Sequence, residues 1–226
     1  MTERIRIADD VDGELATPAG DGKVPGLIVV HEFWGMNDDI RSMCDRFAGE
    51  GFLALAPDLY HGESATDASQ AAMLMQKLST SAAMQDVKAA VARLQQDPRC
   101  NGKIAITGFC MGGAIAFAAA TSVEGLAVAV PFYGIPIPGY FDATKVKCPI
   151  QAHFAKQDQF ADAGRAAAFR DEVHAHGGSM ELHVYDAGHA FMREKDPSAY
   201  DEASAKAAWP RAIAFLKQHL QAQPET

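Results

Sequence analysis

Lys103-Ile-Ala-Ile-Thr-Gly-Phe-Cys-Met-Gly-Gly113 is the stretch that most constrains the fold. Its first half is a short run of apolar residues that favour a strand, and the alanine-rich residues 114–120 that follow favour a helix. The sequence therefore predicts a strand, a tight turn and a helix, with Cys110 at the apex of the turn. At the N-terminus of a helix, the positive end of the dipole favours a thiolate over a thiol.

Two glycines flank Cys110 at the spacing of a nucleophile elbow. Gly108-Phe-Cys-Met-Gly112 matches the pattern Gly-x-Ser-x-Gly, with cysteine in place of serine. The glycines permit a crowded turn that pushes the side chain between them into a cleft. Short patterns of this kind recur by chance, so on this stretch alone Cys110 is equally well a nucleophile or a small core cysteine.

A hydrolase built on an elbow also needs an acid and then a histidine, each just beyond a strand. Residues 149–155 predict a strand that runs into Asp158, and residues 180–185 predict another that runs into His189. The order nucleophile, acid, histidine is that of the α/β-hydrolases, in which histidine relays protons and aspartate holds its tautomer. Taken singly, Asp158 is better explained as a loop residue that caps a helix over residues 162–176, and His189 could be a surface loop histidine.

Strands and helices alternate along the whole chain without a linker that would mark a domain boundary. Residues 26–31 are a continuous apolar run, typical of a strand buried on both faces of a parallel sheet. Pro210 predicts a kink in the last helical segment or the first turn of a separate helix. We therefore expect one domain over residues 1–226 with the α/β-hydrolase fold: a mostly parallel central sheet, helices on both faces and no separate lid domain. The other expected strands are residues 3–7, a stretch near residue 14, 52–56 and 126–132, and the other expected helices are 37–50 (ending at Gly51), 70–78, 82–96 and one ending near residue 220.

Length, charge and cysteine spacing exclude several classes of protein. The 226 residues carry a net charge of -9 and no basic cluster, so nucleic-acid binding is not expected. No apolar run is long enough for a membrane span, and the first residues lack the core of a secretory signal, which indicates the cytoplasm. The remaining cysteines, Cys44, Cys100 and Cys148, have no paired spacing, so we expect structural thiols rather than a disulfide framework or a zinc site.

Six segments in one order carry a resemblance that runs nearly from end to end of the chain. They are Val30-His-Glu-Phe-Trp-Gly35, Ala56-Pro-Asp-Leu-Tyr60, Gly108-Phe-Cys-Met-Gly-Gly113, Phe132-Tyr-Gly134, Gln157-Asp158 and Gly188-His-Ala-Phe-Met-Arg193. Together they resemble the dienelactone hydrolase family of α/β-hydrolases, also called carboxymethylenebutenolidases. The resemblance implies a triad of Cys110, Asp158 and His189 that works without metal or organic cofactor.

The resemblance also places a glutamate, matched by Glu32, next to the resting thiol. A carboxylate at the mouth of a low-dielectric cleft can hold the thiol proton until substrate shifts it and the thiol ionises toward His189. The alternative is a glutamate that merely ends a strand and points to water. We expect the oxyanion hole to consist of the backbone N–H groups of Met111 and Phe33.

Arg193 stands where the family carries an arginine that binds a substrate carboxylate, for which a planar guanidinium is suited. The alternative is a solvated loop arginine. Trp34 and Tyr133 are expected walls of the pocket, although each could equally belong to the core. The chain departs from the family where a second arginine with aromatic neighbours is expected, because residues 68–75 are small, polar or apolar. The pocket is therefore expected to be more apolar.

These observations predict a hydrolase that opens a lactone or cleaves a small ester through an acyl-enzyme intermediate on Cys110. Its partner would be the small-molecule substrate, and the protein would be a monomer or a small homo-oligomer. Two alternatives stay open: a general carboxylesterase or thioesterase, and a hydrolase-like binding protein without turnover.

Overall fold

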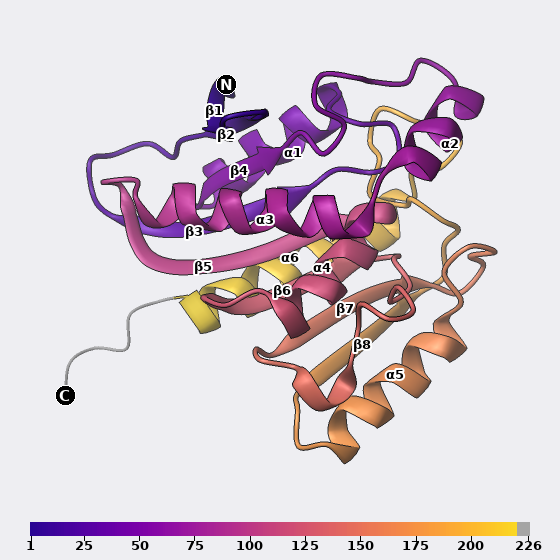
Figure 1. Ribbon diagram of the computed structural model, residues 1–226. Helices are drawn as coiled ribbons and strands as arrows, with labels where there is room; N and C mark the ends of the chain where they lie inside the picture. The colour runs from indigo at the N-terminus through magenta and orange to yellow at the C-terminus, as the bar shows by residue number, and fades with distance from the viewer. Residues whose placement is uncertain (221–226) are drawn as a thin grey trace.

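The computed structural model describes residues 1–220 and contains one eight-stranded sheet (Figure 1). The strands are β1 (Glu3–Ala8), β2 (Val11–Ala16), β3 (Val24–Val30), β4 (Leu53–Pro57), β5 (Cys100–Phe109), β6 (Leu126–Phe132), β7 (Ile150–Ala155) and β8 (Met180–Tyr185). They pair in the order β1-β2-β4-β3-β5-β6-β7-β8. The β1–β2 and β2–β4 pairs are antiparallel and the others are parallel. The mostly parallel sheet confirms the predicted fold class.

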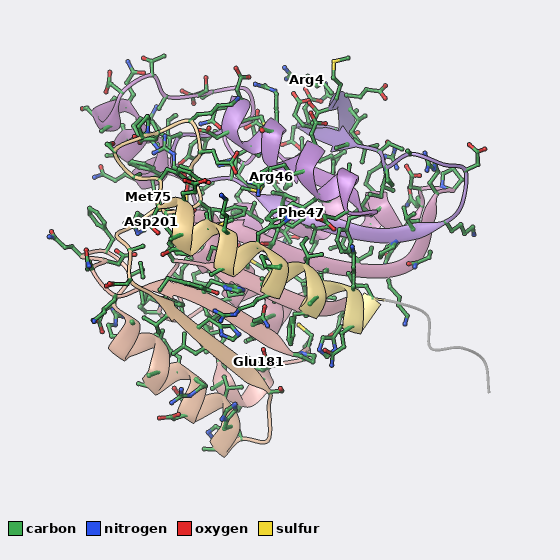
Figure 2. All side chains as sticks on the ribbon, turned by 180° about the vertical axis from the view of Figure 1, so that it is seen from behind. Arg4, Arg46, Phe47, Met75, Glu181 and Asp201 are labelled. Atoms are coloured by element: carbon green, nitrogen blue, oxygen red, sulfur yellow. The ribbon has the colours of Figure 1, made fainter. Side chains whose placement is uncertain are left out.

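Helices cover both faces of the sheet. They are α1 (Asp38–Gly49), α2 (Ala68–Lys77), α3 (Thr80–Gln95), α4 (Met111–Ser122), α5 (Ala163–Ala175) and α6 (Glu202–Leu220), with a short 3-10 helix, η1 (Ala143–Lys145). In Figure 1, α3 and α4 lie in front of the sheet and α6 lies behind it. Figure 2 shows the opposite face, where α1, which carries the labelled Arg46 and Phe47, lies beside α6. The Arg46 guanidinium carbon is 4.1 Å from the centre of the Trp209 ring of α6.

The core lies between the central strands and the helices on either side. The side chains of Leu27, Ile28, Val29 and Val30 in β3 are fully buried, as expected for a strand covered on both faces. Helix α4 is apolar on nearly all sides, because it packs on the sheet and is flanked by α3 and η1. A helix of this kind has no freedom to shift, so the turn that precedes it is held rigidly.

Local signals set the helix ends. The Asn37 side chain accepts a hydrogen bond from the backbone of Ile40 at 3.2 Å and starts α1, and Gly51, with φ +96°, follows its last turn. Pro210 lies inside α6, which runs on without interruption. The alternative of a separate helix starting at Pro210 is therefore wrong: burial of the following apolar face offsets the one backbone hydrogen bond that proline removes.

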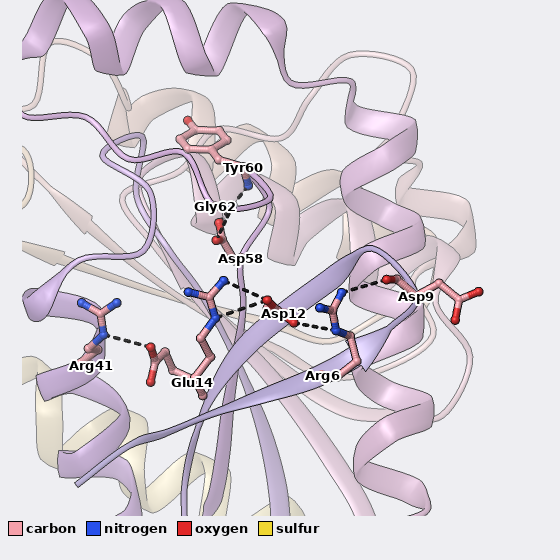
Figure 3. A network of polar contacts seen from close by, with 9 residues as sticks. Arg6, Asp9, Asp12, Glu14, Arg41, Asp58, Tyr60 and Gly62 are labelled. Atoms are coloured by element: carbon pink, nitrogen blue, oxygen red, sulfur yellow. Dashed lines mark hydrogen bonds and ion pairs between the residues drawn. The ribbon is translucent and has the colours of Figure 1, made fainter.

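Polar contacts tie the antiparallel edge of the sheet together (Figure 3). Asp12 in β2 pairs with Arg4 at 2.8 Å and with Arg6 at 2.9 Å, both in β1. Glu14 in β2 pairs with Arg41 of α1 at 3.1 Å. These contacts hold β1, β2 and α1 together, whereas the candidate site lies beyond the carboxyl ends of β3, β5, β7 and β8. That residues 1–226 form a single domain stays a prediction.

Candidate active site

Cys110 occupies a strained turn between β5 and α4. Its backbone has φ 53° and ψ -114°, in a region that residues other than glycine rarely adopt. A Cβ atom on Gly108 would collide with the backbone of Gly112, and one on Gly112 would collide with the carbonyl of Val30. Conformations of this kind cost about 1 to 3 kcal/mol and persist where the surrounding structure enforces them. The strained turn places the Cys110 side chain, which is partly exposed, at the N-terminus of α4.

Asp158 and His189 lie in contact beyond the ends of β7 and β8. The Nδ1 atom of His189 is 2.7 Å from Oδ2 of Asp158. The other carboxylate oxygen, Oδ1, accepts hydrogen bonds from the backbone N–H groups of Phe160 at 2.8 Å and Ala161 at 2.9 Å. Burial raises the pKa of Asp158, but the bonds with His189, Ala161 and Phe160 outweigh it and leave the pKa below its ordinary value. The carboxylate therefore stays ionised and fixes the imidazole with Nδ1 as its donor.

The other side of the His189 ring is directed toward Cys110. Burial lowers the pKa of His189, but hydrogen bonds with Asp158 and with the Cys110 sulfur outweigh it and raise the pKa to about 10. The Asp158 carboxylate on one side of the ring and the Cys110 sulfur on the other thus both favour the protonated form of His189. The arrangement can therefore move a proton between Cys110 and His189 while Asp158 keeps the ring in place.

Cys110 and His189 line the same pocket, which has a volume of about 300 Å³. Phe33 and Met111, whose backbone N–H groups are the expected oxyanion hole, line it as well. The N–H of Met111 has no partner within α4, because Met111 is the first residue of that helix. The other lining residues are Met75, Ala114, Tyr133, Gly134, Ile135, Phe160 and Ala161.

His31 and Tyr60 hold the loop that carries Phe33. The fully buried His31 accepts at Nε2 from the backbone N–H of Leu59 (3.2 Å), so its Nδ1 donates to the carbonyl of Glu32 (2.6 Å). That carbonyl and the N–H of Phe33 belong to one peptide group, whose orientation is thereby fixed. Burial lowers the pKa of His31, so the ring is neutral as this pairing requires.

Tyr60 holds the next peptide group of the same loop. Its hydroxyl lies 3.1 Å from the carbonyl oxygen of Phe33, to which it donates, and 3.4 Å from the sulfur of Met111. The turn that carries Tyr60 is in turn fixed by Asp58, whose carboxylate accepts from the backbone of Tyr60 at 3.1 Å and Gly62 at 2.8 Å (Figure 3). One phenol thus contacts both residues of the expected oxyanion hole.

Glu32 lies buried behind the pocket, with 5% of its surface exposed. Its Oε1 accepts from the Tyr133 hydroxyl at 3.3 Å, and its Oε2 lies 3.2 Å from Nε of Arg193, an ion pair without hydrogen-bond geometry. Burial raises the pKa of Glu32 to about 7, although Arg193 lowers it in part. Burial and the charges of Glu32 and Cys110 raise the pKa of the Tyr133 hydroxyl, and Tyr133 and Cys110 line the same pocket. The alternative of a glutamate that points to water is wrong.

Arg193 pairs with acids and lies outside the pocket that contains Cys110. Besides Glu32, its guanidinium contacts Asp196 at 3.1 Å and Asp39 at 3.7 Å. It lines a smaller cavity, of about 50 Å³, on the far side of Tyr133. Trp34 is also outside the Cys110 pocket: its ring stacks below Arg193, 5.1 Å from the guanidinium carbon. A substrate role for Arg193 or Trp34 stays a prediction, and a substrate carboxylate would have to displace these ion pairs.

The other titratable clusters offer no competing site within residues 1–220. Cys44, Cys100 and Cys148 are buried, and burial raises the pKa of Cys148 to about 12 and that of Cys44 further. In the same part of the chain, no cluster of His, Cys, Asp or Glu side chains is arranged to hold a metal ion. None of the helices there combines the length and apolar character that crossing a membrane requires.

Four residues around the site were not assigned a role from the sequence. His31 and Tyr60 stand inside the quoted segments, but their partners become apparent only when β3 and β4 are paired. Phe160 follows Asp158 by two positions, and this closeness to the predicted acid was the sequence signal that could have placed it in the pocket. Met75 lies in the segment where the family arginine is replaced, and its presence in the pocket agrees with the expected apolar character.

The comparisons with known proteins agree with this geometry. The model of the dienelactone hydrolase family matches residues 11–220. Protein usf from Aquifex pyrophilus is 37% identical over 97% of this chain and 98% of its own length, and a carboxymethylenebutenolidase from a Pseudomonas species is 30% identical over 87% and 86%. The crystal structure of a Klebsiella pneumoniae protein, provisionally assigned as a dienelactone hydrolase, has a TM-score of 0.87 at 26% identity and covers 96% of this chain and 98% of that one. The chain therefore belongs to the dienelactone hydrolase family.

Proposed function

We propose that the protein is a cysteine-dependent hydrolase that opens a lactone or cleaves a small ester through an acyl-enzyme intermediate. One observation carries the proposal: Cys110 and His189 line one pocket, and Asp158 holds the far side of the His189 ring at 2.7 Å. A structural cysteine needs neither the strained turn nor an oriented histidine. This combination of roles, rather than any single position, is the hallmark of a triad.

In the proposed reaction, the Cys110 thiol gives its proton to Nε2 of His189, and sulfur forms a bond to the carbonyl carbon. The carbonyl oxygen becomes an oxyanion that accepts from the N–H groups of Phe33 and Met111. The carbon–oxygen bond of the ester then breaks, and His189 donates its proton to the leaving oxygen. Water then attacks the thioester and its proton passes to His189; the carbon–sulfur bond breaks, and His189 returns that proton to the sulfur, which restores the thiol and the neutral imidazole. In a lactone, the leaving oxygen remains on the same molecule as the acyl group.

Glu32 is proposed to control the resting thiol through Tyr133. The Tyr133 hydroxyl donates to Glu32 at 3.3 Å, and Tyr133 lines the pocket that contains Cys110, so the charge on the carboxylate would act on the sulfur through Tyr133. Arg193 would then act on Glu32 rather than on the substrate, because it already pairs with this carboxylate.

A general carboxylesterase is the second candidate, favoured by the apolar residues that surround Cys110. The cytoplasm, a single domain, and a monomer or small homo-oligomer remain the expectations from the sequence.

Replacement of Cys110 tests the proposal directly. Cys110→Ala should lower kcat for lactones and para-nitrophenyl esters by several powers of ten, because the covalent path is lost. Cys148→Ala is the matched control: it removes a buried thiol that does not line the pocket and should keep activity near the wild-type level. A folded Cys110→Ala variant that retains most of its activity would mean that another group is the nucleophile.

A further inference from the structure

The pocket around Cys110 offers no charged partner to a substrate apart from the triad. Among residues 1–220, none of the side chains that line it is Lys, Arg, Asp or Glu. The Tyr133 hydroxyl, one of its polar groups, is directed to Glu32. A carboxylate entering this pocket would lose its hydration, and a protonated His189 would not be a free partner for it, because that ring already pairs with Asp158.

Two large apolar side chains stand exposed on the pocket wall. Phe160 is 79% exposed and Met75, on α2, is 43% exposed (Figure 2 labels Met75). Phe160 is nevertheless held in place, because Oδ1 of Asp158 accepts from its backbone N–H and from that of Ala161. Exposed apolar surface beside a reactive group, on a backbone that hydrogen bonds hold in place, is typical of a binding wall.

Phe160 also indicates which part of the substrate it meets. Its ring packs edge-on against His189, with the ring centres 5.1 Å apart. Under the proposed mechanism His189 gives its proton to the leaving oxygen, so the leaving group must lie on this side. An apolar leaving group would cover Phe160.

We propose that the protein acts on neutral esters or lactones with an apolar leaving-group portion that packs on Phe160 and Met75, and that it discriminates against carboxylated ones. The inference rests on the proposed hydrolase function and names its substrate class. Two further observations support it. Arg193, a cation near the site, is paired with the acids Glu32, Asp39 and Asp196 and lines the other cavity. The net charge of -9 gives no long-range attraction to anions.

A matched pair of substrates tests the proposal: para-isobutylphenyl acetate and para-carboxymethylphenyl acetate, which have nearly the same shape and differ in charge. Each kcat/KM is divided by the rate of alkaline hydrolysis, which removes differences in intrinsic reactivity. We expect the wild-type protein to prefer the neutral ester by about a hundredfold or more, because the pocket cannot compensate a buried charge. Equal values, or a preference for the carboxylated ester, would overturn the proposal.

Two variants localise the preference. Met75→Arg places a cation in the pocket wall and should reduce the preference by about tenfold or more. Met73→Arg is the matched control, because Met73 lies on the same helix, is 53% exposed and does not line the pocket, so the preference should stay unchanged. Phe160→Ala should lower kcat/KM for the neutral ester by about tenfold and affect the carboxylated ester less.

Binding and sedimentation distinguish the other outcomes. Calorimetric titration with para-isobutylphenol and para-carboxymethylphenol gives the same comparison without turnover, so a retained preference with no hydrolysis would count against the proposed function alone. The inference would be overturned if Met75→Arg left the preference for the neutral ester unchanged. It would also be overturned if Arg193→Ala lowered kcat/KM for the carboxylated ester alone, because Arg193 would then bind the carboxylate. A change of oligomeric state in Phe160→Ala with unaltered preference would do so too, since the exposed ring would then contact a second copy of the chain.

Discussion

Replacing Glu32 by glutamine should remove a specific pH dependence from the stability of the protein. Burial raises the pKa of Glu32 to about 7 from an ordinary value of 4.5, although Arg193, His189 and Tyr133 lower it in part. Between pH 4.5 and 7 the folded state therefore binds more protons at this position than the unfolded state. The stability associated with the protonated carboxyl is fully present below pH 4.5 and is lost as the pH rises through 7.

The size of the effect follows from the two pKa values. Their difference, 7 minus 4.5, is 2.5. At about 1.36 kcal/mol for each pKa unit, the free energy of unfolding falls by about 3 kcal/mol over this range. Glu32 is only 5% exposed, so solvent screens the effect little. Glutamine keeps an acceptor for the Tyr133 hydroxyl but does not titrate.

The assay is urea unfolding of wild type and Glu32→Gln from below pH 4.5 to above pH 7. The quantity to follow is the free energy of unfolding of the wild type minus that of the variant, because groups that titrate alike in both proteins cancel. We expect this difference to decrease by about 3 kcal/mol as the pH rises. A difference that is independent of pH would refute the reasoning, since Glu32 would then titrate alike in the folded and unfolded states.

Three further predictions follow from the site. Asp158→Asn should lower kcat by about four powers of ten because an amide does not hold the required imidazole tautomer; steady-state kinetics on the folded variant checks this, and a loss below tenfold would remove Asp158 from the triad. Tyr60→Phe should lower kcat about tenfold with little change in KM, because it releases the Phe33 carbonyl that its hydroxyl holds at 3.1 Å; equal changes in kcat and KM would contradict this positioning role. Iodoacetamide should alkylate Cys110 before the three buried cysteines, with a pH profile that changes in Glu32→Gln; peptide mass spectrometry resolves the sites, and identical profiles would mean that Glu32 does not influence the thiol.

The parts of the fold that sequence reasoning predicted are those set by neighbours in the chain. The turn at Cys110 depends on glycines two positions to either side, and the start of α1 depends on the Asn37 side chain three positions before its donor. Asp158 and His189 were predicted because each follows a recognisable strand, and parallel strands bring such positions to one edge of the sheet. Local pattern and topology therefore sufficed to identify the candidate triad.

The surroundings of the triad depend on contacts between distant segments, which no local pattern encodes. Arg193 illustrates the limit. Asp196 is three positions away, but Glu32 and Asp39 lie far from Arg193 in the sequence, near the start of the chain, so their ion pairs with Arg193 could not be anticipated. Met75 became part of the pocket wall only through the placement of α2. Pro210 shows the same effect on a helix, because tertiary packing of α6 overrides a local signal to break it.

The central claim, that Cys110 carries the acyl group, is tested most directly by trapping the intermediate. Wild-type protein is mixed with an excess of para-nitrophenyl acetate, quenched with acid within the first turnovers and digested for peptide mass spectrometry. We predict one acetyl group on the peptide that contains Cys110, absent from Cys110→Ala and removed by neutral hydroxylamine, as expected of a thioester. Catalytic turnover with the acetyl group on a different residue, or with full activity in Cys110→Ala, would contradict the account.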